Sequence, residues 1–195
     1  VVCKDTPGFI ANRIGIFVIL DLFHTLEKMN LSVEEMDALT GPLIGRPKSA
    51  TCRTTDVVGL DTMVKVADYL YNVLKEDYAR DIFKLPGFVS EMYKNKWLGD
   101  KTSQGFYKKV KTSEGKTEIH SLDLKTFNYQ TQKKSKFSSL ENIRILDELN
   151  QRIKGLMLVK DTPGILFRKS MYNLFEYVAD KIPEISDDLY KIDLA

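Results

Sequence analysis

The chain has 195 residues, of which 43% are hydrophobic and 10% aromatic, so it is long enough to bury the core of one or two domains. Its formal net charge of +2 favours neither a nucleic acid nor an anionic membrane surface as a partner. Cys3 and Cys52 are too few for a disulfide framework or a zinc site, which indicates free thiols in a reducing compartment, the cytoplasm. The most apolar stretch, Gly15 to Phe23, is about half the ~20 residues that a membrane span needs.

The first predicted element is a long helix from Pro7 to Met29. Thr6 is expected to be its N-cap, and Pro7 suits the first helical position, where a missing N–H has no partner to lose. Apolar side chains then occupy nearly every side of the helix, which is typical of a central helix covered by others. A capping box that begins at Ser32 predicts a short second helix ending at Gly41-Pro42.

The next segment, from Leu43 to Thr55, lacks periodicity and is predicted to be a loop. Asp61 is expected to cap a further helix, in which apolar residues recur at helical spacing up to Leu74. Another helix is predicted over about Gly87 to Trp97, with Val89 on its apolar face.

A small β-hairpin is predicted after these helices. Residues 105–110 and 117–119 alternate in polarity, and turn chemistry lies between them. The segment 125–137 has the composition of a linker and contains the basic run Lys133 to Lys136, which we expect to be solvated. A second capping box, opening at Ser138, predicts a helix that extends to about Lys154.

One sequence occurs twice. The segment Lys4–Ile10 (KDTPGFI) returns 156 residues later as Lys160–Leu166 (KDTPGIL), and the same offset carries Val33 onto Leu189. Both copies therefore predict a helix, a turn and a second helix, with the turn of the second copy near Pro183. We divide the chain into a first helical unit (residues 1–124, copy one), the linker 125–137, and the start of a truncated second unit (residues 138–195, copy two).

The helix after Pro163 carries as heavy an apolar load as its counterpart in copy one, but it lacks the later helices that would share its burial. Large exposed apolar surfaces are rare in monomers, so we expect copy two to dock on the central helix of copy one. We also expect a homodimer.

Four motifs occur in one order: Lys4–Arg13, Gly45–Pro47, Asp56–Asp61 and Gly99–Tyr107. Together they resemble the helical C-terminal domain of 3-hydroxyacyl-CoA dehydrogenase over about residues 1–109. The resemblance implies an all-α bundle, here with one small β-hairpin and a truncated second copy. The duplication is similar to that of longer fatty-acid β-oxidation enzymes, which carry two such helical domains, often beside an enoyl-CoA hydratase domain.

In that family an N-terminal Rossmann domain binds NAD and holds a His-Glu pair that takes the proton from the substrate 3-hydroxyl. This chain contains no two glycines separated by a single residue, so it has no Gly-x-Gly-x-x-Gly phosphate loop. We interpret His24 and His120 as structural. The resemblance thus implies that a separate Rossmann domain binds NAD, that acyl-CoA is the substrate of the complete enzyme, and that the chain alone is inactive.

The resemblance assigns a catalytic role to Asn12, from the motif Pro-Gly-Phe-Ile-x-Asn-Arg. An amide in a nearly all-apolar helix needs a hydrogen-bond partner, and from the residues alone we favour a structural amide bonded to a neighbouring loop; the resemblance turns the interpretation to an amide directed at the substrate. Arg13 and Lys101 are candidate substrate-binding residues: Lys101 for a phosphate of CoA, and Arg13 for the substrate side, the Rossmann domain or a nearby carboxylate. Copy two has Arg168 where copy one has Asn12, so we expect copy two to be structural.

Two other functions stay open. In one, the chain is a non-catalytic helical dimerisation module. In the other, it is the helical domain of another β-hydroxyacid dehydrogenase. The motif around Asn12 favours the dehydrogenase over the assembly module, and the sequence 105–107 (GFY) favours it over the other hydroxyacid enzymes.

Overall fold

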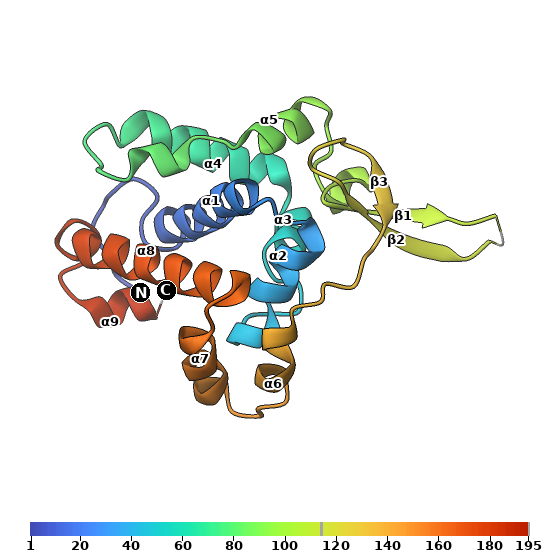
Figure 1. Ribbon diagram of the computed structural model, residues 1–195. Coiled ribbons are helices and arrows are strands. Elements are labelled where there is room, and N and C mark those ends of the chain that lie inside the picture. Colours follow the sequence, from blue (N-terminus) through green and yellow to red (C-terminus); the bar gives the residue numbers. More distant parts are fainter. Residues whose placement is uncertain (114, 195) are drawn as a thin grey trace.

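A computed structural model of the protein describes residues 1–113 and 115–194, most of which are helical (Figure 1). The α-helices are α1 (Ala11–Met29), α2 (Val33–Thr40), α3 (Cys52–Val58), α4 (Leu60–Val73), α5 (Gly87–Lys94), α6 (Glu141–Arg144), α7 (Leu149–Leu158), α8 (Thr162–Ile185) and α9 (Leu189–Asp193). The 3-10 helices are η1 (Pro42–Ile44), η2 (Arg80–Phe83), η3 (Asp100–Thr102) and η4 (Ser138–Leu140). Within this part of the chain no helix is both long and apolar enough to cross a membrane.

Helix α1 is the central helix of the molecule, as the sequence predicts. Leu20 and Phe23 are completely buried, and α4, η2 and α8 pack around the helix (Figure 1). The hydrophobic core is continuous across the two copies, since Leu156 and Phe167 of copy two belong to the same buried cluster as Phe23.

The start of α1 differs from the prediction. The helix begins at Ala11, not at Pro7, and Ile10 rather than Thr6 is its N-cap. Residues 7–10 form turns in which Gly8 and Phe9 have φ angles of +80° and +50°. A left-handed Phe9 is incompatible with a helix continuing from Pro7.

Helix α2 has the predicted capping box: Ser32 Oγ accepts from the Glu35 N–H, and the Glu35 carboxylate accepts from the Ser32 N–H. The loop predicted for residues 43–55 is confirmed over residues 45–51, whereas η1 and the start of α3 occupy its two ends. The cap of α3 comes from another helix, since the Asp37 carboxylate of α2 accepts the N–H groups of residues 51–53. A sequence window around α3 contains no sign of this cap.

The predicted hairpin is confirmed by β1 (Tyr107–Lys111) and β2 (Thr117–Leu122), which pair antiparallel with Tyr107 opposite Ser121. A third strand, β3 (Tyr129–Thr131), adds to β2 and lies in the segment expected to be a linker. Its Tyr129 ring packs 5.8 Å from the ring of Trp97, so tertiary contact rather than local pattern orders this strand.

Copy two is helical, but its boundaries differ from the predicted ones. The helix expected over 138–154 is broken into η4, α6 and α7, and the Ser138 capping box does not form. Helix α8 begins at Thr162 with Asp161 as N-cap, and it passes through Pro183, where a turn was predicted. Pro183 has no N–H to donate within the helix, and α8 ends two residues later, at Ile185.

Copy two docks on copy one along α1 and α8, which lie side by side in Figure 1, as the sequence predicts. The Phe17 and Tyr177 rings stack with centroids 3.9 Å apart, and Asn173 Nδ2 donates to Asp21 Oδ1 at 2.8 Å. The partners on α8 descend as those on α1 ascend, so the helices are antiparallel. At the repeat offset of 156 residues, Asn173 is the counterpart of Phe17, and Tyr177 is the counterpart of Asp21. Exchanging the two copies therefore converts one contact into the other, as expected for two copies related by an approximate twofold axis.

Candidate functional site

The turn that precedes α1 forms one wall of a cavity. Phe9 N–H donates to the Thr6 carbonyl (3.0 Å), and Arg13 N–H donates to the Gly8 carbonyl (3.2 Å), which closes the turn against the helix. A Cβ atom at Gly8 would lie 3.0 Å from Leu70 Cδ2 and 3.1 Å from the Arg13 nitrogen. Glycine is therefore favoured at this position by its left-handed φ and by the close approach of Leu70 and the Arg13 backbone.

The cavity has a volume of about 510 Å³ and lies between the turn and α4. Its lining consists of residues 5–9, Asn12, Lys65, Val66 and Tyr69. The rings of Phe9 and Tyr69 are about half exposed, and the buried Thr6 hydroxyl has no hydrogen-bond partner among the described residues. The cavity thus combines an amide, a hydroxyl, an ammonium group and the carboxylate of Asp5 with apolar walls, which suits a ligand with a polar head and an apolar chain.

Asn12 lies at this cavity and is exposed. The expectation that its amide is buried and needs an internal partner is therefore wrong, because the apolar surround of α1 begins after this first helical turn. Its position nevertheless leaves the amide open to a ligand. The catalytic role of Asn12 stays a prediction.

Arg13, the next residue, points into the protein and is completely buried. Its Nε donates to Tyr177 Oη (2.6 Å), its Nη1 to Glu184 (2.9 Å) and to the Pro7 carbonyl (3.4 Å), and its Nη2 to Asp77 (2.6 Å) and Glu184 (3.3 Å). All five N–H groups of the guanidinium therefore have acceptors. Of the partners considered for Arg13, nearby carboxylates are the ones that the structure shows, namely Asp77 and Glu184. None of its donors remains for a substrate.

A second cation, Lys181, shares the carboxylates around Arg13 and also pairs with Asp180 at 2.8 Å. Lys181 Nζ lies 3.2 Å from Asp77 and 3.4 Å from Glu184, and the Tyr177 hydroxyl donates to Asp77 at 3.1 Å. Burial acts to raise the pKa of Asp77, but hydrogen bonds from the Ala79 N–H, Arg13 and Lys181 together hold it below its usual value. We call Arg13, Asp77, Tyr177, Lys181 and Glu184 the Arg13 cluster.

Lys101 is not among the residues that line the Asn12 cavity. Its ammonium pairs with Asp61, and hydrogen bonding to Lys101 outweighs burial in lowering the pKa of that carboxyl. Asp61 is not the predicted N-cap either, since α4 begins one residue earlier with Gly59 in that position. The pair connects η3, which contains Lys101, to the start of α4.

The motif from Gly99 to Tyr107 is organised by Asp56, the first residue of the motif 56–61, to which the sequence pattern assigns no role. Asp56 of α3 is buried, and its carboxylate accepts from the N–H groups of Phe106 (2.8 Å) and Tyr107 (2.9 Å). A Cβ atom at Gly99 or Gly105 would overlap Asp56. Burial raises the pKa of Asp56 to about 7, although both N–H groups and Arg53 act to lower it.

Neither histidine lines the Asn12 cavity. His24 Nε2 lies 3.1 Å from the Ile82 carbonyl, and His120 lies 3.4 Å from Glu118 on the same strand.

In copy two, Arg168 donates to the carbonyls of Met157 and Val159 and so closes the end of α7. The residue that replaces Asn12 therefore makes a structural contact.

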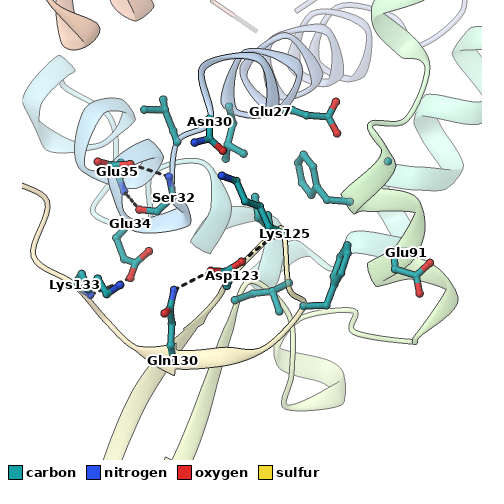
Figure 2. Close-up of a pocket in the computed structure, with 17 residues that line it drawn as sticks. Glu27, Asn30, Ser32, Glu34, Glu35, Glu91, Asp123, Lys125, Gln130 and Lys133 are labelled. Atoms are coloured by element: carbon teal, nitrogen blue, oxygen red, sulfur yellow. Dashed lines mark hydrogen bonds between the residues drawn. The ribbon is translucent and has the colours of Figure 1, made fainter.

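A larger cavity, of about 930 Å³, lies between the end of α1, the start of α5 and the turn between β2 and β3 (Figure 2). Several of its polar groups are used by local structure: Glu35 belongs to the capping box of α2, Glu34 accepts from Ser121, and Asp123 accepts from the backbone of its own turn. We therefore place the candidate site at the smaller cavity, which is lined by residues of the first motif, including Asn12.

Comparisons with known proteins match this region. The family model described as 3-hydroxyacyl-CoA dehydrogenase, C-terminal domain, matches residues 8–109. A probable 3-hydroxyacyl-CoA dehydrogenase of Bacillus subtilis (strain 168) is 42% identical over 195 residues, which cover 100% of this chain and 24% of the relative. A putative fatty acid oxidation complex trifunctional enzyme of Rickettsia felis is 28% identical over 99% of this chain and 25% of its own length.

The mitochondrial hydroxyacyl-coenzyme A dehydrogenase of Rattus norvegicus is 32% identical over 106 residues, which are 54% of this chain and 32% of the relative. The chain thus spans about a quarter to a third of the length of these relatives. The rat enzyme aligns with about half of the chain, whereas the two bacterial relatives align with almost all of it.

Proposed function

Since this chain belongs to the 3-hydroxyacyl-CoA dehydrogenase family through its C-terminal domain, we propose that it is the substrate-side part of such an enzyme. The complete enzyme would be NAD-dependent and would oxidise (S)-3-hydroxyacyl-CoA to 3-ketoacyl-CoA in fatty-acid β-oxidation. The relatives whose printed names include fatty acid oxidation support the pathway.

The observation that carries this proposal is the exposed amide of Asn12 at the cavity between the first turn and α4. We assign the amide to the reacting part of the substrate, and the rings of Phe9 and Tyr69 to the acyl chain beside it. Lys65 supplies a positive charge on the same cavity. We assign Arg13 to the support of the site, because its donors are all used inside the protein.

The described residues do not fit NAD. They form one small antiparallel sheet and contain no parallel strand–helix–strand unit whose helix N-terminus would receive a pyrophosphate. We therefore assign NAD to a Rossmann domain that packs against this chain. The dinucleotide supplies the oxidising chemistry when bound there, and this chain contributes the acyl-CoA side.

We further propose that the enzyme is a homodimer in the cytoplasm. Tyr172 and Phe175 on α8 are 57% and 61% exposed, and a second copy would cover them. The free thiols Cys3 and Cys52 agree with a reducing compartment.

The pairing of α1 with α8 favours an assembly module as the second candidate function, since that contact joins two copies of one helical unit.

Turnover of the complete enzyme that contains this chain separates the two candidates. Asn12→Ala should lower kcat for a 3-hydroxyacyl-CoA by more than about tenfold while the protein stays folded, because an exposed amide contributes little to stability. Asn95→Ala, which removes another exposed amide, is the matched control and should leave kcat unchanged. If both variants retain full turnover, Asn12 is not catalytic and the assembly module is the better description.

A further inference from the structure

The repeated sequence Lys-Asp-Thr-Pro-Gly has two different conformations in one molecule. In copy two the helix α8 begins at Thr162, inside the repeat. In copy one the equivalent residue is Thr6, yet α1 begins only at Ala11 and residues 7–10 form turns with two left-handed residues. Pro7 and Gly8 are identical to their counterparts in copy two, so these two residues do not by themselves explain why the first turn of α1 stays unwound; Phe9 and Ile10 replace Ile165 and Leu166.

The backbone of this turn is attached to the end of α8. Lys4 N–H donates to the Ile185 carbonyl (2.9 Å), and Lys4 Nζ donates to the Pro183 carbonyl (2.7 Å). Ile10, the N-cap of α1, is buried in a small cluster with Ile185 and Ile192. Copy two therefore contacts the turn both before and after its left-handed residues.

Arg13 adds a third attachment. Its guanidinium is held by Tyr177 and Glu184 of α8 and by Asp77, and it donates to the Pro7 carbonyl inside the turn. Asn12 precedes Arg13 in the first helical turn and lies at the exposed cavity, whereas Arg13 is buried in the cluster. Fixing Arg13 on the inner side of the helix therefore fixes the direction of Asn12.

We propose that copy two positions Asn12: Tyr177 and Glu184 hold Arg13, keep residues 7–10 out of the helix, and so maintain the wall of the Asn12 cavity. This inference rests on the proposed function and gives the second copy a task within it. When the cluster is weakened, residues 7–10 wind into α1 as their counterparts do in α8, and the cavity wall is lost. Arg13, Tyr177 and Glu184 are positioning residues.

Tyr177→Phe in the complete enzyme tests the proposal, because it removes one hydroxyl and keeps the ring that stacks on Phe17. We expect kcat to fall about tenfold or more, with a smaller change in KM, since small displacements of a reacting group strongly reduce turnover. Tyr190→Phe is the same change at an exposed position of copy two, on α9, and should leave kcat within about twofold. Equal kcat values for the two variants would overturn the proposal.

Glu184→Gln, with Glu176→Gln as its control on the same helix, repeats the test at a partly exposed position where the substitution is well tolerated. Hydrogen exchange of the 195-residue chain gives a readout that is independent of turnover. The amides of residues 10–12 should exchange more slowly in Tyr177→Phe and Glu184→Gln, because winding of the turn gives them helical acceptors.

Exchange that is unchanged or faster than in the control variants would contradict the winding of the turn. The exchange measurement also separates this inference from the function on which it rests. If Asn12→Ala retains full turnover, the proposed function fails, and slower exchange in Tyr177→Phe still supports the attachment of the turn to copy two.

Discussion

Replacing Arg13 with Met is the perturbation to which the junction of the two copies should respond most strongly. The substitution keeps a side chain of similar length but removes the positive charge and five hydrogen-bond donors from a completely buried position. Asp77, whose side chain is only 2% exposed, then loses its shortest contact.

The loss of stability in Arg13→Met depends on how well the carboxylates that contacted the guanidinium are satisfied by other groups. Removing one partner of a buried ion pair typically costs about 3–5 kcal/mol. Here the lower end applies, because Lys181 still pairs with Asp77 and the Glu184 side chain is 38% exposed. We therefore expect Arg13→Met to lower the free energy of unfolding by about 3 kcal/mol, and the midpoint of thermal unfolding by roughly 6–12 °C for a chain of this length.

Arg53→Met is the matched control. Arg53 forms a two-point contact with Asp100, but the side chains are 38% and 53% exposed, so its loss should cost less than about 1 kcal/mol. Urea unfolding followed by circular dichroism measures both variants, and equal slopes of the two transitions would show that the unfolded states are comparable. If Arg13→Met costs no more than Arg53→Met, the cluster does not stabilise the junction.

Three further outcomes are expected. The folded-state pKa of Asp56 is about 7 and the ordinary value is 3.8, so the folded state keeps the proton to a higher pH than the unfolded state does. The wild type should therefore lose stability relative to Asp56→Asn as the pH rises from about 4 to 7, and urea midpoints of the two proteins that stay equally far apart over this range would contradict this. Calorimetry of the chain alone should detect no NAD or NADH binding; a stoichiometric micromolar signal would refute the assignment of NAD to another domain. Gly8→Ala should destabilise the protein more than Gly115→Ala, because both positions have positive φ but Gly115 faces open space; equal unfolding midpoints would argue against the crowded turn.

Much of the helical framework could be predicted from the sequence because its signals are local. The apolar pattern after Gly15, the capping box at Ser32 and the turn chemistry between residues 110 and 117 each act within a few residues. The missed elements depend on distant residues. Helix α3 is capped by Asp37 from another helix, and β3 is ordered by a sheet whose other strands precede it in the chain.

The candidate site was only partly predictable. The motif draws attention to Asn12 and Arg13, but no local pattern indicates that the first is exposed at the cavity and the second is completely buried. That difference arises from the late start of α1 and from acceptors 64 to 171 residues away in the chain. The partners Tyr177 and Glu184 have ordinary sequence surroundings, so only their proximity to Arg13 marks them.

The central claim is that the cavity beside Asn12 receives the reacting part of the substrate. A crystal structure of the complete enzyme with a bound 3-ketoacyl-CoA tests it most directly. We expect the 3-keto oxygen to lie within hydrogen-bond distance of the Asn12 amide, about 3 Å, with the acyl chain beside Phe9 and Tyr69. A 3-ketoacyl group bound in the larger cavity near Phe88, or anywhere out of reach of Asn12, would contradict the account.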